Sequence, residues 1–167
     1  MKTGTLIFFC GKMGAGKSTR AAELACAPRT VLISEDAWLS ALYPDQIHSV
    51  EAYISRAQRL RAPMKLLVQS VLSAGTNVVM DFPANTVRQR AWFRDIFENA
   101  GAPHRLEFID VTDEVCLARI ALRRTQQPER AATDTVEMFE RVTAYFEPPL
   151  AEEGFNVVRV LNEPGKD

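Results

Sequence analysis

Cysteine is scarce in this sequence, and the few cysteines present form no recognisable site. Cys10, Cys26 and Cys116 are an odd number in a chain of 167 residues, and no two of them make a C-x-x-C pair. These facts argue against a disulfide-stapled scaffold and against a cysteine-rich zinc site. The sequence also has no charged-then-apolar leader and no long apolar run, so neither secretion nor a membrane span is predicted. A reducing cytoplasm is the expected location.

An excess of charge of one sign is missing as well. Lys and Arg total 20 and Asp and Glu total 21, so the formal net charge is −1. This balance provides no overall attraction to nucleic acid or to an anionic membrane, although a local basic cleft stays compatible with it. His48 and His104 are isolated in the sequence, and their positions do not match the spacing of metal ligands. We expect no histidine-based metal site.

What the chain does contain is one complete phosphate-binding motif. Residues 11–18 read GKMGAGKS and fit the P-loop pattern G-x-x-x-x-G-K-[ST]. The apolar run Leu6–Cys10 precedes the motif, and a helical pattern begins near Lys17. Backbone N–H groups can curl around a polyphosphate only where no side chain blocks the approach, which explains the glycines. The predicted nucleotide-binding residues are Gly11, Lys12, Met13, Gly14, Ala15, Gly16, Lys17, Ser18 and Thr19.

Two side chains of the P-loop have predicted roles of their own. Lys17 supplies a fixed positive charge to the β- and γ-phosphates, and Ser18 offers its hydroxyl to Mg²⁺. The helix that follows adds the positive end of its dipole. A glycine-rich turn with a solvated lysine is the alternative, but it leaves the spacing of the motif unexplained. We therefore expect ATP and Mg²⁺ as cofactors, and because the sequence has no N-K-x-D segment to read guanine, ATP is preferred over GTP.

The hydrophobic pattern predicts one α/β domain over residues 1–167. Hydrophobic residues make up 47% of the chain, enough for a sizeable core. Strands alternating with helices predict a three-layer α/β/α fold with a mainly parallel five-stranded sheet. The expected strands are Leu6–Cys10, 31–33, 77–81, 105–110 and 156–160, and the expected helices are Lys17–Ala25, 49–60, 64–74, 88–100, 112–124 and 135–146, before a frayed tail over 162–167.

Carboxylates follow two of the expected strands. Glu35 and Asp36 come after strand 31–33, and Asp81 ends strand 77–81. Ligands of an open parallel sheet bind at the carboxyl ends of its strands, so these groups should face the same region as the P-loop. There Asp81 would hold a Mg²⁺-bound water, the Walker B role, with a structural or helix-capping role as the alternative.

Two arginines lie four residues apart on an expected helix. Arg119 and Arg123 therefore share one helix face and could reach the same polyphosphate. The polar loop after them resembles the lid that closes over ATP in P-loop kinases, so a helical lid is expected at about residues 119–134. A solvated basic helix face is the alternative interpretation. Phosphoryl transfer favours the lid, because it needs several cations around the transferring group and Lys17 supplies only one.

Together these segments resemble the P-loop kinase group that includes polynucleotide kinase, chloramphenicol phosphotransferase and zeta-toxin-like enzymes. The resemblance covers most of the chain. Besides the P-loop, it rests on residues 34–38 (SEDAW), 79–81 (VMD) with Asn85 and Arg90, 116–123 (CLARIALR), and 146–149 (FEPP) with 153–155 (EGF).

The resemblance implies that an aspartate after the second strand is the general base, and Asp36 matches it. Group members often have two acidic residues followed by an aromatic one, whereas the order here is Glu35-Asp36-Ala37-Trp38, so the choice between Glu35 and Asp36 stays open. The predicted catalytic residues are Lys17, Asp36, Arg119 and Arg123; the predicted metal residues are Ser18 and Asp81; the predicted acceptor residues are Glu35, Trp38, Asn85 and Arg90. Trp38 could equally pack in the core.

The expected activity is ATP-dependent transfer of the γ-phosphate to a hydroxyl of a small-molecule or nucleotide-like acceptor. Two alternatives stay open. One is a polynucleotide 5′-hydroxyl kinase, which the neutral charge balance does not favour. The other is a nucleotide-binding ATPase or switch that acts through a protein partner.

Overall fold

The computed structural model describes residues 2–161, so the predicted tail at 162–167 lies outside the described residues. Its centre is a single parallel sheet with the strand order β2-β3-β1-β4-β5. The predicted three-layer α/β/α fold with five parallel strands is confirmed. The strands are β1 (Leu6–Cys10), β2 (Thr30–Ser34), β3 (Asn77–Pro83), β4 (His104–Asp110) and β5 (Val157–Leu161).

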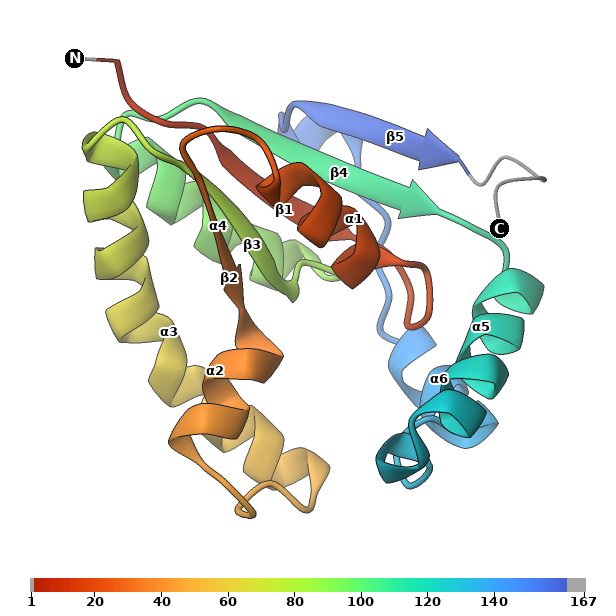
Figure 1. The fold of residues 1–167 in the computed structure, drawn as a ribbon. Helices are drawn as coiled ribbons and strands as arrows, with labels where there is room; N and C mark the ends of the chain where they lie inside the picture. Colours follow the sequence, from red (N-terminus) through yellow and green to blue (C-terminus); the bar gives the residue numbers. More distant parts are fainter. Residues whose placement is uncertain (1, 162–167) are drawn as a thin grey trace.

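Helices cover both faces of the sheet (Figure 1). They connect successive strands, as expected for parallel pairing. The α-helices are α1 (Lys17–Ala25), α2 (Glu35–Leu42), α3 (Val50–Ser73), α4 (Val87–Asn99), α5 (Asp113–Gln126) and α6 (Val136–Thr143), and two short 3₁₀ helices are η1 (Pro128–Arg130) and η2 (Ala151–Glu153). No helix in the described part of the chain is long and apolar enough to cross a membrane.

The central strand β1 supplies side chains to two separate cores. Phe8 is fully buried on the face that α3 and α4 cover, where its ring stacks on Phe93 of α4 at a centroid distance of 4.5 Å. Phe9 is fully buried on the opposite face, against α1 and α5. Successive side chains of a strand point to opposite faces, and both faces are covered here, so the strand reads as one apolar run.

Helix α3 corrects one prediction. Two helices were expected on either side of Pro63, but α3 runs unbroken through that residue. From Ala57 to the end of the helix, buried side chains recur every three to four residues: Ala57, Leu60, Met64, Val68 and Leu72. This continuous apolar stripe packs on the sheet, and its burial outweighs the hydrogen bond that a proline removes from a helix interior.

Helix α2 was not predicted. Ser34 caps it by accepting a hydrogen bond from the Ala37 backbone N–H at 3.3 Å, and two acidic residues fill its first turn. In Figure 1, α2 and the first half of α3 extend beyond the sheet on one side, and α5 and α6 extend on the other. The carboxyl end of β1 and the P-loop lie between these two arms.

Candidate active site

The P-loop joins β1 to α1 and is shaped by two glycines with positive φ, Gly14 (78°) and Gly16 (102°). A Cβ on Gly14 would lie 2.7 Å from the Cys116 carbonyl oxygen and 2.9 Å from a side-chain carbon of Ile120. Both neighbours belong to α5. Gly14 is therefore needed for its backbone conformation and for the close approach of α5 to the loop.

The side chain of Lys17 donates hydrogen bonds to the backbone of the P-loop. Its Nζ donates hydrogen bonds to the carbonyl oxygens of Gly11 (2.5 Å) and Lys12 (2.9 Å). Burial lowers the pKa of Lys17, and the nearby charge of Asp81 acts in the opposite direction. The ammonium group thus lies inside the loop, where a fixed charge is most effective because water does not screen it well.

Ser18 and Asp81 meet at the edge of the sheet. The Ser18 hydroxyl donates a hydrogen bond of 2.7 Å to Asp81 Oδ2. Burial raises the pKa of Asp81, and the charge of Asp36 acts in the same direction, while the Ser18 hydrogen bond opposes it. The two predicted metal residues are thus in direct contact.

Glu35 and Asp36 have opposite environments. Glu35 is only 2% exposed and accepts a short hydrogen bond from the Tyr53 hydroxyl. Burial raises the pKa of Glu35. Asp36 is exposed, and its charge acts on Asp81. Ser34, two residues before Asp36, pairs in register with Asp81 across β2 and β3. Asp36 is therefore the accessible carboxylate next to the Ser18–Asp81 pair.

The remaining predicted residues lie around this centre. Lys12 Nζ pairs with Asp113 at 2.6 Å, and Met13 packs against the core that α1 and α5 cover. Thr19 is exposed in α1. Trp38 lies on α2 with 38% of its surface exposed, so it is not a core residue.

The two lid arginines contact different partners. Arg119 donates a hydrogen bond of 2.8 Å to the Ala15 carbonyl oxygen of the P-loop. Arg123 instead donates two hydrogen bonds, each of 2.7 Å, to the carboxylate of Asp134. Arg130 donates a third, of 3.1 Å, to the same group. Asp134 is 1% exposed; burial alone would raise its pKa, but the two arginines lower it overall.

Asp134 was not singled out from the sequence. The available signal in the sequence was a carboxylate four residues after Arg130 in a mostly polar loop. A residue in a loop gives no periodic pattern, and only the folded lid brings Arg123 to it.

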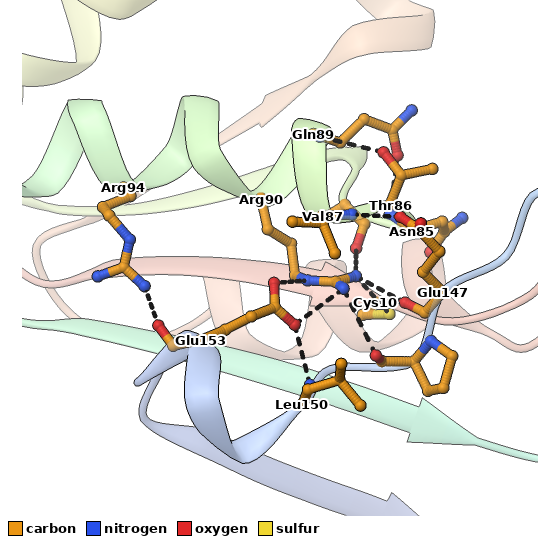
Figure 2. A network of polar contacts seen from close by, with 12 residues as sticks. Cys10, Asn85, Thr86, Val87, Gln89, Arg90, Arg94, Glu147, Leu150 and Glu153 are labelled. Atoms are coloured by element: carbon orange, nitrogen blue, oxygen red, sulfur yellow. Dashed lines mark hydrogen bonds and ion pairs between the residues drawn. The ribbon is translucent and has the colours of Figure 1, made fainter.

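Arg90 differs from its prediction as an acceptor residue. It is fully buried, and its guanidinium pairs with Glu153 at 2.8 Å and donates to the carbonyl oxygens of Ala84 (3.0 Å) and Glu147 (2.8 Å). It also lies 3.8 Å from the Cys10 sulfur, and burial raises the pKa of that thiol to about 11. Figure 2 shows this network in the interior. We therefore assign Arg90 a structural role in place of the predicted acceptor contact.

Asn85 supports the P-loop in the same network. Its Oδ1 accepts a hydrogen bond of 2.9 Å from the Gly11 N–H, and its backbone oxygen accepts one of 2.8 Å from Glu147. Glu147 in turn accepts from the Val87 N–H at the start of α4 (2.7 Å; Figure 2). Asn85 thus supports the first glycine of the P-loop, and its role as an acceptor residue stays a prediction.

Comparison with known proteins agrees with this geometry. The family model described as AAA domain matches residues 6–149. A search of curated proteins found no match. Among solved structures, Kti12 of Chaetomium thermophilum in complex with ADP-AlF3 is 24% identical with a TM-score of 0.67; the alignment covers 97% of this chain and 90% of that chain.

Two further structures have similar folds. The Mycobacterium tuberculosis APS kinase CysC, in complex with AMPPNP and APS, is 18% identical with a TM-score of 0.57, and the alignment covers 100% of this chain and 92% of that one. The Pnkp1/Rnl/Hen1 RNA repair complex gives 21% identity and a TM-score of 0.62 over 99% of this chain and 51% of that one. These structures share the fold of this chain, and the family match over residues 6–149 shows that the chain belongs to the AAA domain family.

Proposed function

We propose that the protein is an ATP-dependent, Mg²⁺-requiring kinase that transfers the γ-phosphate of ATP to a hydroxyl of a small acceptor. One observation carries the proposal. The exposed carboxylate of Asp36 lies at the same sheet edge as the P-loop, beside the hydrogen-bonded pair of Ser18 and Asp81. A P-loop alone would serve any nucleotide-binding protein, whereas a free carboxylate beside it suits proton removal from an acceptor.

The P-loop holds the donor in this proposal. The loop amides and the N-terminal end of α1 bind the β- and γ-phosphates. Lys17 exchanges its hydrogen bonds with the Gly11 and Lys12 carbonyl oxygens for contacts with phosphate oxygens. Because the lysine is already inside the loop, this exchange needs only a small movement of its side chain.

Ser18 and Asp81 fit a Mg²⁺ site. Nucleotide-bound Mg²⁺ usually takes only one or two protein oxygens and fills the rest of its octahedron with phosphate oxygens and waters. A hydroxyl and a carboxylate in direct contact at 2.7 Å offer that set. When bound, the ion offsets negative charge on the β- and γ-phosphate oxygens.

Asp36 acts as the general base. It accepts the proton of the acceptor hydroxyl as that oxygen forms a bond to the γ-phosphorus. The bond from the γ-phosphorus to the β,γ-bridging oxygen breaks, and ADP leaves. Glu35 is less suited to this role, because it is buried and already accepts a hydrogen bond from Tyr53.

The lid completes the site. Arg119 already contacts the P-loop backbone at Ala15, and Arg123 lies one helical turn further along α5. We propose that both guanidiniums stabilise the negative charge that develops on the transferring group. The expected location is the cytoplasm.

The similar structures support nucleotide binding, since their descriptions name AMPPNP in one case and ADP-AlF3 in another. The exposed carboxylate of Asp36 favours a kinase over a nucleotide switch, because a switch has no acceptor hydroxyl to deprotonate.

Asp36→Asn tests the proposal. The amide keeps the size of the side chain but is not basic, so transfer should fall by roughly 10²- to 10⁴-fold, while ATP affinity should hardly change. A screen of hydroxyl-bearing metabolites, antibiotics, nucleotides and 5′-hydroxyl oligonucleotides identifies the acceptor by mass, and calorimetry measures ATP affinity.

Asp95→Asn is the matched control, because it makes the same chemical change at an exposed position on α4. Near-normal transfer by the Asp36→Asn variant would remove Asp36 as the base and move the assignment to Glu35. If phosphoryl transfer is near normal in the Glu35→Gln variant as well, neither carboxylate at this strand end is the general base.

A further inference from the structure

A cleft of about 260 Å³ lies between α3 and the start of α4, and we call it the α3–α4 cleft. Tyr53, Arg61 and other residues of α3 line one side, and Thr86, Arg88 and Gln89 line the other. Its volume is below the range of about 300–1,000 Å³ that holds a drug-sized ligand. The cleft is thus suited to one chemical group of a small molecule.

The lining of the cleft includes two cations, Arg61 and Arg88, and no carboxylate. The buried carboxylate of Glu35 lies near enough to interact electrostatically with Arg61, which leaves an excess of positive charge. Gln58, Thr86 and Gln89 add hydrogen-bonding groups. Two guanidiniums without a carboxylate between them favour an anion, and the planar guanidinium matches the oxygen pairs of phosphate, sulfate and carboxylate groups.

One N–H group of Arg61 lacks a hydrogen-bond acceptor in the described part of the chain. Its Nε is buried and has no hydrogen-bond partner among the described residues. Its guanidinium lies over the Trp92 ring at 5.5 Å from the ring centroid, and this contact holds the side chain in position. A buried N–H without an acceptor is destabilising, and such groups often mark a site that a ligand fills.

Two residues of the cleft lining lie close to the proposed transfer site. Tyr53 lines the cleft and donates its hydroxyl proton to a hydrogen bond with Glu35, the neighbour of Asp36 in the first turn of α2. Pro83, which also lines the cleft, follows Asp81 by two residues on β3. One small molecule can therefore reach from the cleft to Asp36.

We propose that the α3–α4 cleft binds an oxyanion of the acceptor, a phosphate, sulfate or carboxylate group, through Arg61 and Arg88. The hydroxyl of the same molecule then lies at Asp36. The second statement rests on the proposed kinase function, whereas anion binding in the cleft does not. The acceptor is thus a small anionic alcohol rather than a neutral one.

The intrinsic fluorescence of Trp92 provides a direct test. The chain has two tryptophans, so Trp38→Phe leaves Trp92, which Arg61 contacts, as the single reporter. This variant is first saturated with Mg-AMPPNP, so that anions cannot bind in the P-loop. It is then titrated with ribose 5-phosphate, inorganic sulfate and glycerate, and with ribose as the uncharged partner.

Ribose 5-phosphate should give a saturable change in Trp92 fluorescence, and ribose should give none. Sulfate and glycerate show which oxyanion is preferred.

Arg61→Gln and Arg88→Gln should each weaken anion binding by at least about tenfold, the effect of losing a charged hydrogen bond. Arg59→Gln is the matched control, because Arg59 is an exposed arginine of α3 outside the cleft lining. Circular dichroism measures whether each variant is folded. Arg88 is exposed, so Arg88→Gln should fold and still tests the cleft if Arg61→Gln does not fold.

Anion binding that is equal in the Arg61→Gln, Arg88→Gln and Arg59→Gln variants would overturn the proposal, as would equal responses to ribose and ribose 5-phosphate. A response to a 5′-hydroxyl oligonucleotide with none to the small anions would also overturn it and would favour the nucleic-acid alternative. Anion binding that depends on Arg61 supports the cleft even where the acceptor screen detects no phosphoryl transfer, and in that case the kinase function alone fails.

Discussion

Lys17 shows how one residue prepares a binding site. Its ammonium group donates two hydrogen bonds that close the P-loop. In the proposed function, phosphate oxygens take the place of these carbonyl oxygens, so the charge is in position before the nucleotide binds. Preorganised charge of this kind is effective because little rearrangement accompanies binding.

Lys17→Ala should abolish nucleotide-dependent stabilisation while leaving the protein folded. At ATP concentrations about 100 times the dissociation constant, binding stabilises the wild type by about 2.7 kcal/mol, which corresponds to a rise in Tm of roughly 5–10 °C for a chain of this size. Thermal melting with and without Mg-ATP measures this rise. Lys65→Ala, at a partly exposed ion pair with Asp95, serves as the control and should keep it. A full rise in the Lys17→Ala variant would contradict the assigned role of the lysine.

Helix α5 shows how an element connects two parts of the site. Its backbone lies against Gly14, and its Arg119 holds the Ala15 carbonyl oxygen. Further along, Arg123 and Arg130 share the buried Asp134. The lid is therefore attached to the P-loop at one end and held together by its own ion pairs at the other.

Arg123→Ala should lower kcat by at least about tenfold and change KM for ATP less, because the guanidinium acts chiefly on the charge of the transferring group. Steady-state kinetics gives both constants. Arg141→Ala, at an exposed position on α6, is the control and should leave both unchanged. If Arg123→Ala has normal kcat, the arginine serves only the structural ion pair with Asp134.

At the scale of the whole molecule, the segment after α6 returns across the sheet and ties distant parts of the chain together. Arg90 contacts this segment at Glu147, Pro148 and Glu153 (Figure 2). Asn85 connects the same segment to the first glycine of the P-loop. The active-site loop thus depends on residues more than 130 positions away in the sequence.

Glu153→Gln should destabilise the protein by about 3 kcal/mol, because it leaves the buried Arg90 charge without its counter-ion. This loss corresponds to a fall in Tm of roughly 6–12 °C. Glu152→Gln makes the same change at the exposed neighbour and should have little effect. Thermal melting at pH 7 compares the two variants, and equal Tm values would contradict a stabilising Arg90–Glu153 pair.

The same pair should also make stability depend on pH. Burial alone would raise the pKa of Glu153, but the hydrogen bonds from Arg90 and the Leu150 N–H lower it overall. A lowered folded-state pKa means that the stabilisation is complete above the unfolded-state pKa of about 4.3 and is lost as the pH falls through the folded-state value. The difference in Tm between wild type and the Glu153→Gln variant should therefore shrink below about pH 4. A constant difference down to pH 2 would contradict this coupling.

The sequence by itself determined the features that depend on neighbouring residues. The P-loop was readable because its chemistry needs glycines and a lysine at fixed spacing over eight positions. The parallel fold was readable because apolar runs alternate with helical patterns. Helix α2 was missed although Ser34 and the acidic first turn were visible, because its apolar face is too short for a clear period.

Only the tertiary structure decided the roles of residues that act through distant partners. Glu35 and Asp36 are chemically alike and adjacent in sequence, and it is the packing of Tyr53 from α3 that buries one and leaves the other exposed. Arg90 looked like an acceptor residue until its partners, 57 to 63 positions away, enclosed it. Burial and pairing are set by contacts between elements far apart in the chain, and a local pattern contains no information about them.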